Sequence, residues 1–179
     1  NSFAFDKIVL PTMKAMAKCK GVYINLKDSR ERKQLIEESL NFLKQEKIYS
    51  RHEGIRGKKE EAEERHLSKG EVGIWKTWIE ILEEESKGGD YDYLHILEDD
   101  ARLSKECIEF ISKLSHKEPQ FDLLFTDMYV NPQVYNLLYD KYCELKNTKK
   151  MQILDGSSLY TGCLSSVLIH RNKISKILK

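Results

Sequence analysis

Long apolar runs are missing from this sequence of 179 residues. No stretch reaches the roughly 18–20 apolar residues that a membrane-spanning helix needs, and the N-terminus has no signal-peptide pattern. The sequence also lacks an excess of either charge, because 30 basic and 29 acidic residues leave a net charge of +1. Such a balance gives no general attraction to nucleic acid or to an anionic membrane. We therefore expect no nucleic-acid partner and no transmembrane segment, with peripheral membrane contact left open.

Several catalytic and metal-binding motifs are absent as well. No two of the four cysteines have the CxxC spacing of zinc ribbons and thioredoxins. The chain has no GxxxxGK[ST] loop, no GxGxxG and no GxSxG. Cys163 has no evident activating partner, which argues against cysteine nucleophile chemistry. Free thiols in a reducing cytoplasm are the expected state of the cysteines, so we expect a cytoplasmic protein.

What is present fits one folded domain. Hydrophobic residues make up 40% of the chain and charged residues 33%, values typical of a globular protein. A chain of this length can bury a sizeable core. We expect a helical N-terminal extension over residues 1–20 and one domain over residues 21–179. Because the chain begins with Asn1 and stops within an apolar helical pattern at Lys179, we expect the natural protein to continue.

Two kinds of apolar pattern alternate along the chain. Short β-branched and aromatic runs predict buried strands, and apolar residues at helical spacing predict helices between them. The predicted strands cover residues 22–26, 48–53, 93–97, 121–125 and 164–169. The predicted helices cover about 29–46, 68–87, 104–114 and 134–145, and a last one follows residue 172. This alternation predicts an α/β fold with a mostly parallel sheet flanked by helices.

Three local features refine this picture. Residues 56–66 carry almost no apolar side chain, which favours a solvated loop or an exposed helical turn over a mobile loop beside a ligand site. Ser68 and Glu71 have the spacing of a helix capping box. His95 lies inside the predicted strand 93–97, so we expect a core or interface histidine and not a ligand.

The strongest chemical feature is an acidic triplet, Glu98, Asp99 and Asp100, directly after the strand 93–97. Side chains alternate along a strand, so Glu98 and Asp100 can point the same way. Three neighbouring negative charges cost free energy unless a cation lies among them, and a divalent cation that also holds phosphate oxygens is a common solution. The carboxyl ends of strands are where α/β sheets bind ligands. The alternative is an acidic surface turn that caps a helix.

The junction after the first strand offers further candidates. Asn25 and Leu26 end the strand, and the following helix N-terminus is a natural place for an anion or a base edge. Arg32 lies in the first turn of that helix, where its charge does not complement the helix dipole. This position hints at a ligand or a buried partner for Arg32, whereas the residues alone favour an ordinary surface arginine with Glu31 nearby.

Two other positions have open explanations. Gly70 and Gly73 flank Glu71 at the start of a predicted helix, where glycine lowers stability relative to alanine. Close approach of a ligand would explain these glycines, and so would packing of another chain segment. Asp127 follows the predicted strand 121–125 and is a candidate general base, with a turn aspartate as the alternative.

Four short motifs follow one another in a fixed order. They are VYINL followed by Ser29, Glu31 and Arg32 in residues 22–33, RHEGIRG in 51–57, LSKGEVG in 67–73 and LHILEDDA in 94–101. In this order they resemble the INL…S.ER, R.EAIDG, LTPGEIGC and LILEDDA motifs of family-25 glycosyltransferases, which include bacterial lipooligosaccharide and collagen galactosyltransferases. Residues 162–171 are loosely similar to the late G…YLISR strand of that family.

The resemblance implies a GT-A-like (Rossmann-like) core that transfers a hexose to a saccharide hydroxyl in glycan or lipopolysaccharide synthesis. UDP-galactose is the implied donor, the displacement is implied to be inverting, and Asp127 is the candidate base. Mn²⁺ or Mg²⁺ is implied at a DXD-like site made by Glu98 and Asp100. The inner face of a bacterial membrane is an implied location. The residues implied in donor binding are Asn25, Leu26, Arg32, Gly70, Glu71 and Asp99.

The chain departs from the family pattern in a few places. The family has Ser-His in the helix after its GE.GC motif, where this chain has Thr77 and Trp78. Ile74 replaces the family's cysteine, Arg56 replaces an acidic residue, and Arg30 stands where proline is common. Two other functions therefore stay open: a glycosyltransferase-like binding domain without activity, and a metal-dependent nucleotidyltransferase.

Overall fold

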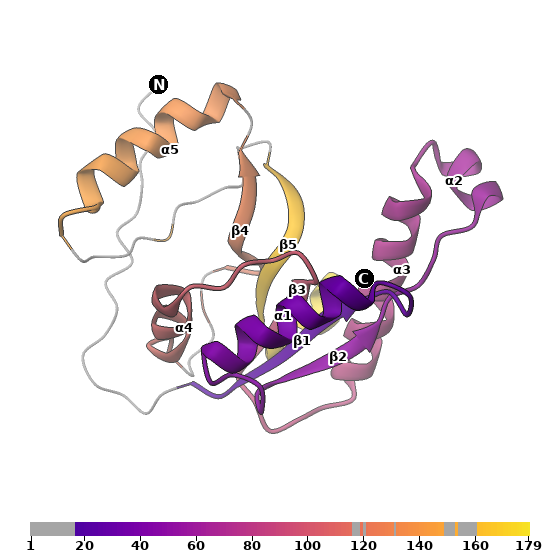
Figure 1. The fold of residues 1–179 in the computed structure, drawn as a ribbon, viewed down its shortest axis with the longest axis horizontal. Helices are drawn as coiled ribbons and strands as arrows, with labels where there is room; N and C mark the ends of the chain where they lie inside the picture. The colour runs from indigo at the N-terminus through magenta and orange to yellow at the C-terminus, as the bar shows by residue number, and fades with distance from the viewer. Residues whose placement is uncertain (1–16, 116–118, 120, 131, 149–152, 154–160) are drawn as a thin grey trace.

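The computed structural model describes residues 17–115, 119, 121–130, 132–148, 153 and 161–179 (Figure 1). The strands are β1 (Cys19–Asn25), β2 (Tyr49–Glu53), β3 (Tyr93–Glu98), β4 (Leu124–Val130) and β5 (Thr161–His170). The helices are α1 (Arg30–Phe42), α2 (Lys59–Arg65), α3 (Lys69–Ser86), α4 (Lys105–Ser112), α5 (Pro132–Leu145) and α6 (Ile174–Ile177). The 3₁₀ helix η1 (Arg171–Lys173) precedes α6.

The described strands form one sheet in the order β2-β1-β3-β5-β4. β1 pairs in parallel with both β2 and β3, whereas β5 is antiparallel to β3 and to β4. β4 therefore runs in the same direction as β1, β2 and β3. The predicted α/β fold is confirmed, and its sheet is open and mixed.

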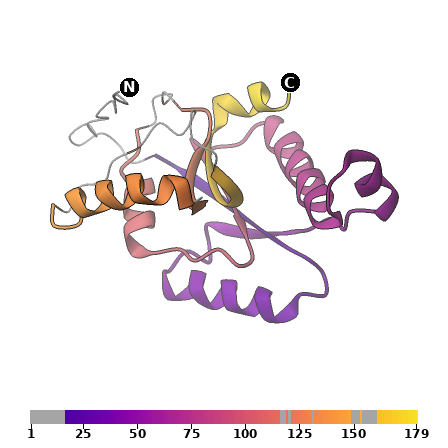
Figure 2. The ribbon, with the colours of Figure 1, turned by 90° about the horizontal axis from the view of Figure 1, so that it is seen from above.

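Helices cover both faces of this sheet, with α1 on one side and α3 and α6 on the other (Figure 2). Because side chains alternate along a strand, each central strand contributes apolar residues to both faces. The core beneath α3 and α6 contains Val22, Ile24, Leu94, Ile96, Val167, Ile169, Trp78, Ile81 and Ile174. The cores beneath α1 and α4 contain Tyr23, Leu97, Ile36 and Leu40, and Tyr93, Leu168, Phe110 and Ile111. None of the helices in the described ranges combines the length and apolar character needed to cross a bilayer.

Helix α1 ends earlier than its sequence pattern predicts. It stops at Phe42 instead of about residue 46, because Lys44 adopts a left-handed φ of 57°. The amides of Lys44 and Gln45 bond to the carbonyl oxygens of Asn41 at 2.9 Å and Leu40 at 2.8 Å. These two bonds form a Schellman motif, which satisfies the last carbonyl groups of the helix.

The starts of α3 and β1 can also be compared with the sequence pattern. Ser68 and Glu71 form the predicted capping box at the start of α3. β1 begins at Cys19, which already pairs with Tyr93, so the first strand starts two residues before the predicted domain start at residue 21. The division into an extension and one domain stays a prediction. Residues 1–16, where most of the predicted N-terminal helix falls, lie outside the described residues.

The charged segment 56–66 contains helix α2, so the helical alternative is the one that forms. Its only buried side chain is Ala62. Lys59 and Glu63 are paired one turn apart at 3.6 Å, and Glu61 accepts a bond of 2.5 Å from Lys76 of α3. Good helix-forming residues and a few contacts with α3 suffice for two turns without an apolar face.

The prediction that a strand ends at Asp127 is wrong. β4 begins at Leu124 and continues to Val130, so Asp127 lies inside the strand, at an irregularity in its pairing with β5. Asp127 pairs with Ser166, and Ser166 in turn pairs with Leu97 of β3. The polar residues Thr126 and Asp127 suggest the end of a strand, but β4 lies at the edge of the sheet, where strands tolerate polar residues.

A buried polar network crosses the sheet at His95, which has no exposed surface. Tyr49 Oη lies 2.6 Å from His95 Nδ1, and Ser166 Oγ lies 2.9 Å from His95 Nε2. Tyr49 reaches His95 by lying across Gly21, where a Cβ would collide with the tyrosine ring. The expectation of a core histidine is confirmed.

We predict that this network makes stability depend on pH. Burial lowers the pKa of His95 to about 3, so between pH 6.5 and 3 the unfolded chain binds a proton that the folded chain does not. The contribution of the neutral His95 to the free energy of unfolding is therefore fully present above pH 6.5. Below that pH the free energy of unfolding falls, by up to about 1.4 kcal/mol per pH unit. Urea titrations between pH 7.5 and 5 measure this slope.

His95→Gln should flatten the slope, although the variant is less stable at pH 7.5. His66→Asn is the matched control, because His66 is exposed and asparagine tolerates its left-handed backbone at φ 54°. A wild-type stability that stays constant from pH 6.5 to 5 would contradict the assignment of a neutral, buried His95.

Candidate functional site

A cleft of about 340 Å³ lies at the edge of the sheet where the parallel strands β1, β2 and β3 end. Three parts of the chain form it: the end of β1 with the start of α1, the loop after β2 with the first half of α3, and the end of β3. The lining residues are Ile24, Leu26, Arg32, Gly54, Ile55, Arg56, Gly57, Lys69, Gly70, Ile74, Thr77, Glu98 and Asp99. This is the edge at which α/β sheets bind their ligands.

One wall of the cleft is held by direct backbone packing between the loop 54–57 and α3. A Cβ on Gly57 would collide with the carbonyl oxygen of Lys69, and a Cβ on Gly73 would collide with the carbonyl oxygen of Ile55. The Ile55 amide donates to Thr77 Oγ1 at 2.8 Å, and the Thr77 hydroxyl donates to the Gly73 carbonyl oxygen at 2.8 Å. Packing of a chain segment therefore explains Gly73, and Thr77 is a fully buried clamp.

Gly70 has a different environment from Gly73. It lines the cleft, and a Cβ there would meet only Ser68 Oγ at 3.7 Å. Glu71 does not line the cleft, because its carboxylate accepts a bond of 2.7 Å from the Ser68 amide in the capping box. That bond lowers the pKa of Glu71. Of the two predicted binding residues here, Gly70 borders the cleft and Glu71 stabilises the helix.

The opposite wall depends on a buried contact between the ends of β1 and β3. Ile24 is paired with Glu98, which brings Asn25 beside Asp99. Asn25 Nδ2 donates to Asp99 Oδ2 at 2.6 Å and also contacts the Ser29 carbonyl oxygen at 3.0 Å. Both Asn25 and Asp99 are buried. Asn25 thus shapes the site through Asp99 and does not itself line the cleft.

Arg51 of β2 completes the surroundings of Asn25. Its Nε donates to Asn25 Oδ1 at 3.1 Å, and its Nη2 donates to the Asn25 carbonyl oxygen at 3.2 Å. With Asp99 and Arg51 on either side, the Asn25 side chain is fully bonded. Sequence reasoning missed Arg51, because its role depends on the pairing of β2 with β1.

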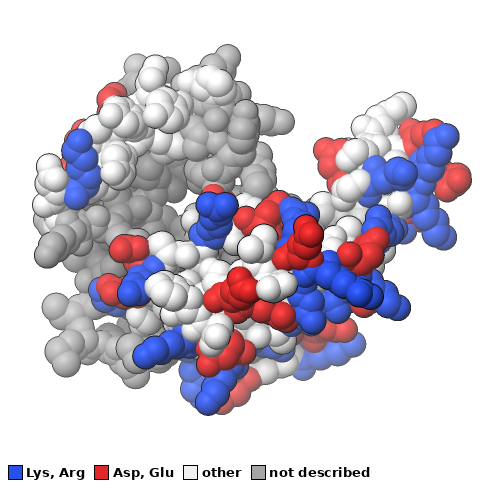
Figure 3. All heavy atoms as spheres, in the orientation of Figure 1, with Lys and Arg blue, Asp and Glu red and all other residues white. Residues whose placement is uncertain are grey.

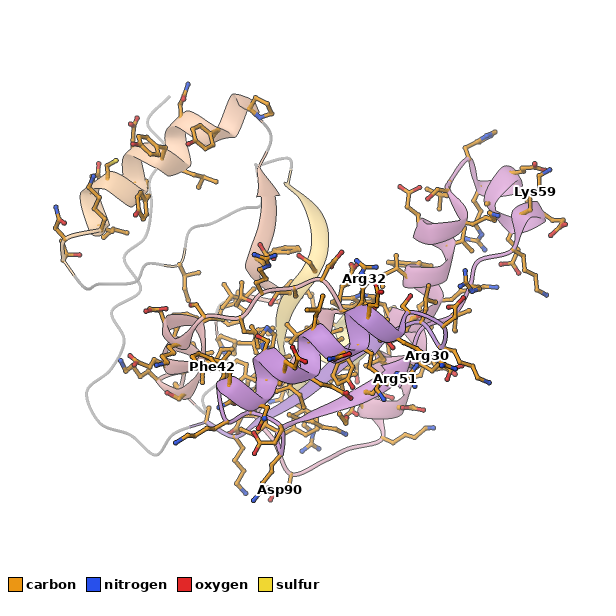
Figure 4. The ribbon with its side chains drawn as sticks, viewed as in Figure 1. Arg30, Arg32, Phe42, Arg51, Lys59 and Asp90 are labelled. Atoms are coloured by element: carbon orange, nitrogen blue, oxygen red, sulfur yellow. The ribbon has the colours of Figure 1, made fainter. Side chains whose placement is uncertain are left out.

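Arg32 supplies the positive charge at the acidic turn. Its Nε lies 3.1 Å from Asp99 Oδ1, and its Nη2 pairs with Asp100 Oδ2. Arg32 is therefore paired with two members of the acidic triplet, the buried Asp99 and the exposed Asp100. Figure 4 places Arg32 and Arg30 at the N-terminal end of α1 and Phe42 at its other end.

Glu98 is the member of the triplet that Arg32 does not bind directly. Its side chain lines the cleft and is half-buried. Burial raises the pKa of Glu98, the charges of Asp100 and Asp99 raise it further, and Arg32 partly offsets them. An added cation beside Glu98 would relieve this unfavourable environment.

Basic side chains surround the rest of the opening. Arg56 lines the cleft and pairs with Asp28, and Lys69 lines it from the first turn of α3. Figure 3 shows acidic and basic atoms intermingled over α1 and around α2 and α3 on the face in view. Arg56 and Lys69 lie in the segments 51–57 and 67–73, but the charge pattern alone does not distinguish them from the many charged residues nearby.

Asp127 lies apart from this cleft. It is exposed, accepts a bond of 3.2 Å from Ser165, and does not line the cavity. Asp127 of β4 and Leu97 of β3 both pair with Ser166 of β5, so they lie at the same level of the sheet. Two strand spacings, or about 10 Å, separate them. A role for Asp127 as general base stays a prediction.

The predicted metal site is a pair of carboxylates and not a complete ligand set. Among the described residues, no group of three or more His, Cys, Asp or Glu side chains is arranged to hold a metal ion. Glu98 and Asp100 nevertheless fit a cation that is completed by phosphate oxygens and water, because Glu98 lines the cleft and Asp100 is exposed.

No family model matches the chain, and no curated protein matches its sequence. The geometry of the cleft and the order of the four motifs around it are therefore the basis for the functional argument. The residues that line the cleft are far apart in the sequence and close together in space.

We predict opposite effects for alanine at two glycines of the same helix. Gly73→Ala should destabilise the protein by about 1–3 kcal/mol, because the new Cβ forces the loop 54–57 away from α3. Gly70→Ala should leave stability unchanged or slightly raised, because the new methyl group meets only Ser68 Oγ at an ordinary contact distance. Chemical denaturation of both variants checks the pair, and equal losses would contradict the packing described for Gly73.

Proposed function

We propose that this chain is the donor-binding domain of a glycosyltransferase, which moves a hexose from a nucleotide sugar to a saccharide hydroxyl. One observation carries the proposal. The four segments that resemble family-25 motifs, residues 22–33, 51–57, 67–73 and 94–101, all contribute to the lining of the same cleft. A chance resemblance gives no reason for four separate segments to meet at one cavity. The open α/β sheet is also compatible with a GT-A-like, Rossmann-like core.

The lining of the cleft combines the apolar and charged groups that a nucleoside diphosphate needs. Ile24, Leu26 and Ile74 offer an apolar surface that suits a nucleobase. Arg32 and Glu98 also line the cleft and offer the charges that a diphosphate and its cation would contact. Its volume is within the roughly 300–1,000 Å³ that small-molecule sites occupy. UDP-galactose is the donor we expect.

Glu98 and Asp100 would hold Mn²⁺ or Mg²⁺, and the bound cation would stabilise negative charge on the departing nucleotide. Asp99 has a different part, because its carboxylate is already bonded to Asn25 and Arg32. It fixes the turn so that Glu98 faces the cleft. Donor contacts from Leu26, Arg32 and Gly70 follow from their place in the lining.

An exposed carboxylate on the same sheet would remove the proton of the acceptor hydroxyl. Asp127 stays our candidate, since it lies level with the end of β3 and is open to solvent. The saccharide acceptor and the cytoplasmic location at a membrane surface are part of this proposal.

The departure from the family at position 78 does not weaken the proposal. Trp78 is buried in the core between α3 and the sheet, so this position contributes no group to the cleft. Thr77, at the other changed position, clamps the loop 54–57 in place. The cleft therefore keeps its acidic and basic groups despite both changes.

Calorimetric titration tests this function. We expect UDP-galactose to bind only weakly without Mn²⁺ and more tightly with it. Glu98→Gln and Asp100→Ala should each weaken the Mn²⁺-dependent binding by at least about tenfold. Asp90→Asn is the matched control, because Asp90 is an exposed aspartate that pairs with Lys18 before the amino end of β3 (Figure 4).

The reaction product separates the remaining alternatives. A glycosyltransferase releases UDP from the sugar nucleotide, whereas a nucleotidyltransferase forms pyrophosphate. Metal-dependent binding without turnover of any tested acceptor would favour an inactive binding domain. Absence of metal-dependent binding in the wild-type protein would rule out the proposed function.

A further inference from the structure

Arg32 occupies an unfavourable position for a structural cation. It is the third residue of α1, where the positive end of the helix dipole opposes its charge. Its side chain is 49% exposed, yet its guanidinium contacts two carboxylates of the turn that follows β3. The carboxylates of the acidic turn therefore offset the unfavourable interaction between Arg32 and the helix dipole.

The two carboxylates that Arg32 contacts differ sharply in environment. The Asp99 side chain is 7% exposed and has a second partner in Asn25, which holds it at 2.6 Å. The Asp100 side chain is 54% exposed, and Arg32 is its one bonded partner in the part of the chain that the structure describes. The contact with Asp99 is therefore fixed, and the contact with Asp100 can be exchanged at little cost.

Glu98 adds the third element. It lines the cleft beside Arg32, and no hydrogen-bond donor among the described side chains reaches its carboxylate. Arg32 thus bonds to Asp99 and Asp100 and acts on Glu98 only through its charge. It also lines the cleft itself, so a guanidinium edge released from Asp100 would face the space where an anion binds.

We propose that Arg32 is an exchangeable counter-cation, which gives up Asp100 to a divalent cation and uses the released guanidinium edge to bind the donor diphosphate. This inference rests on the proposed function. Arg32 would stay attached to Asp99 throughout, so the exchange needs rotation of one side-chain end and no movement of α1. The same residue would then oppose binding of the metal alone and favour binding of the nucleotide.

Opposite changes in two affinities test this exchange. In Arg32→Gln, we expect Mn²⁺ alone to bind about three to ten times more tightly, because a competing cation is gone. UDP in the presence of saturating Mn²⁺ should bind about tenfold more weakly, because a charged contact to the diphosphate is lost. Electron paramagnetic resonance of free Mn²⁺ measures the first affinity, and calorimetry measures the second.

Two further variants control the experiment. Arg30→Gln removes an arginine from the same turn of α1 outside the cleft lining, and both affinities should match those of the wild type. Arg32→Lys keeps the charge without the two-pronged guanidinium, so its Mn²⁺ affinity should stay near the wild-type value while UDP binding weakens. Thermal unfolding of each variant verifies that it is folded.

The outcomes separate this inference from the proposed function. If wild-type protein binds UDP with Mn²⁺ but Arg32→Gln binds Mn²⁺ no more tightly, the exchange is wrong and the proposed function stands. If both affinities fall in Arg32→Gln, Arg32 only supports the turn, and the exchange is again wrong. If neither protein binds Mn²⁺, the exchange and the metal site of the proposed function fail together.

Discussion

The hydrogen bond between Asn25 and Asp99 is the contact on which the acidic side of the cleft depends. It joins the ends of two parallel strands at 2.6 Å and satisfies a buried carboxylate. A buried charge without partners is strongly unfavourable, so this bond and the contact from Arg32 are what allow an acidic turn to form here. Because Asp99 is turned inwards, Glu98 lines the cleft and Asp100 reaches solvent.

The other side of the cleft is fixed by an unrelated device. The loop 54–57 approaches α3 so closely that neither Gly57 nor Gly73 has room for a side chain. Thr77 bonds to both partners and closes this contact. One wall is thus positioned by charge and hydrogen bonding and the other by shape, which leaves a cavity whose width is set before any ligand arrives. Such preformed sites need little ordering on binding.

Local patterns in the sequence sufficed for much of the fold. The apolar runs in β1 and β3, the capping box of α3 and the buried His95 could all be predicted, because each depends on neighbouring residues or on burial alone. The acidic triplet and Arg32 were recognised as candidate site residues for the same reason. Their mutual contact was not predicted, since it requires β1 to lie directly beside β3.

Other features of the fold and the site depend on distant parts of the chain. Asp127 was placed at a strand end, but β4 is extended by its pairing with β5. Gly73 could be a ligand contact or a packing contact on the sequence alone, and only the path of the loop 54–57 decides between them. Pairing order and loop paths are not encoded in local periodicity.

A crystal structure of the protein with UDP and Mn²⁺, recorded with anomalous scattering, tests the central claim most directly. The account predicts a manganese peak bonded to Glu98 and Asp100, with the diphosphate beside Arg32 and the nucleobase against Leu26 and Ile74. A nucleotide bound elsewhere, or a manganese peak away from both carboxylates, would contradict it.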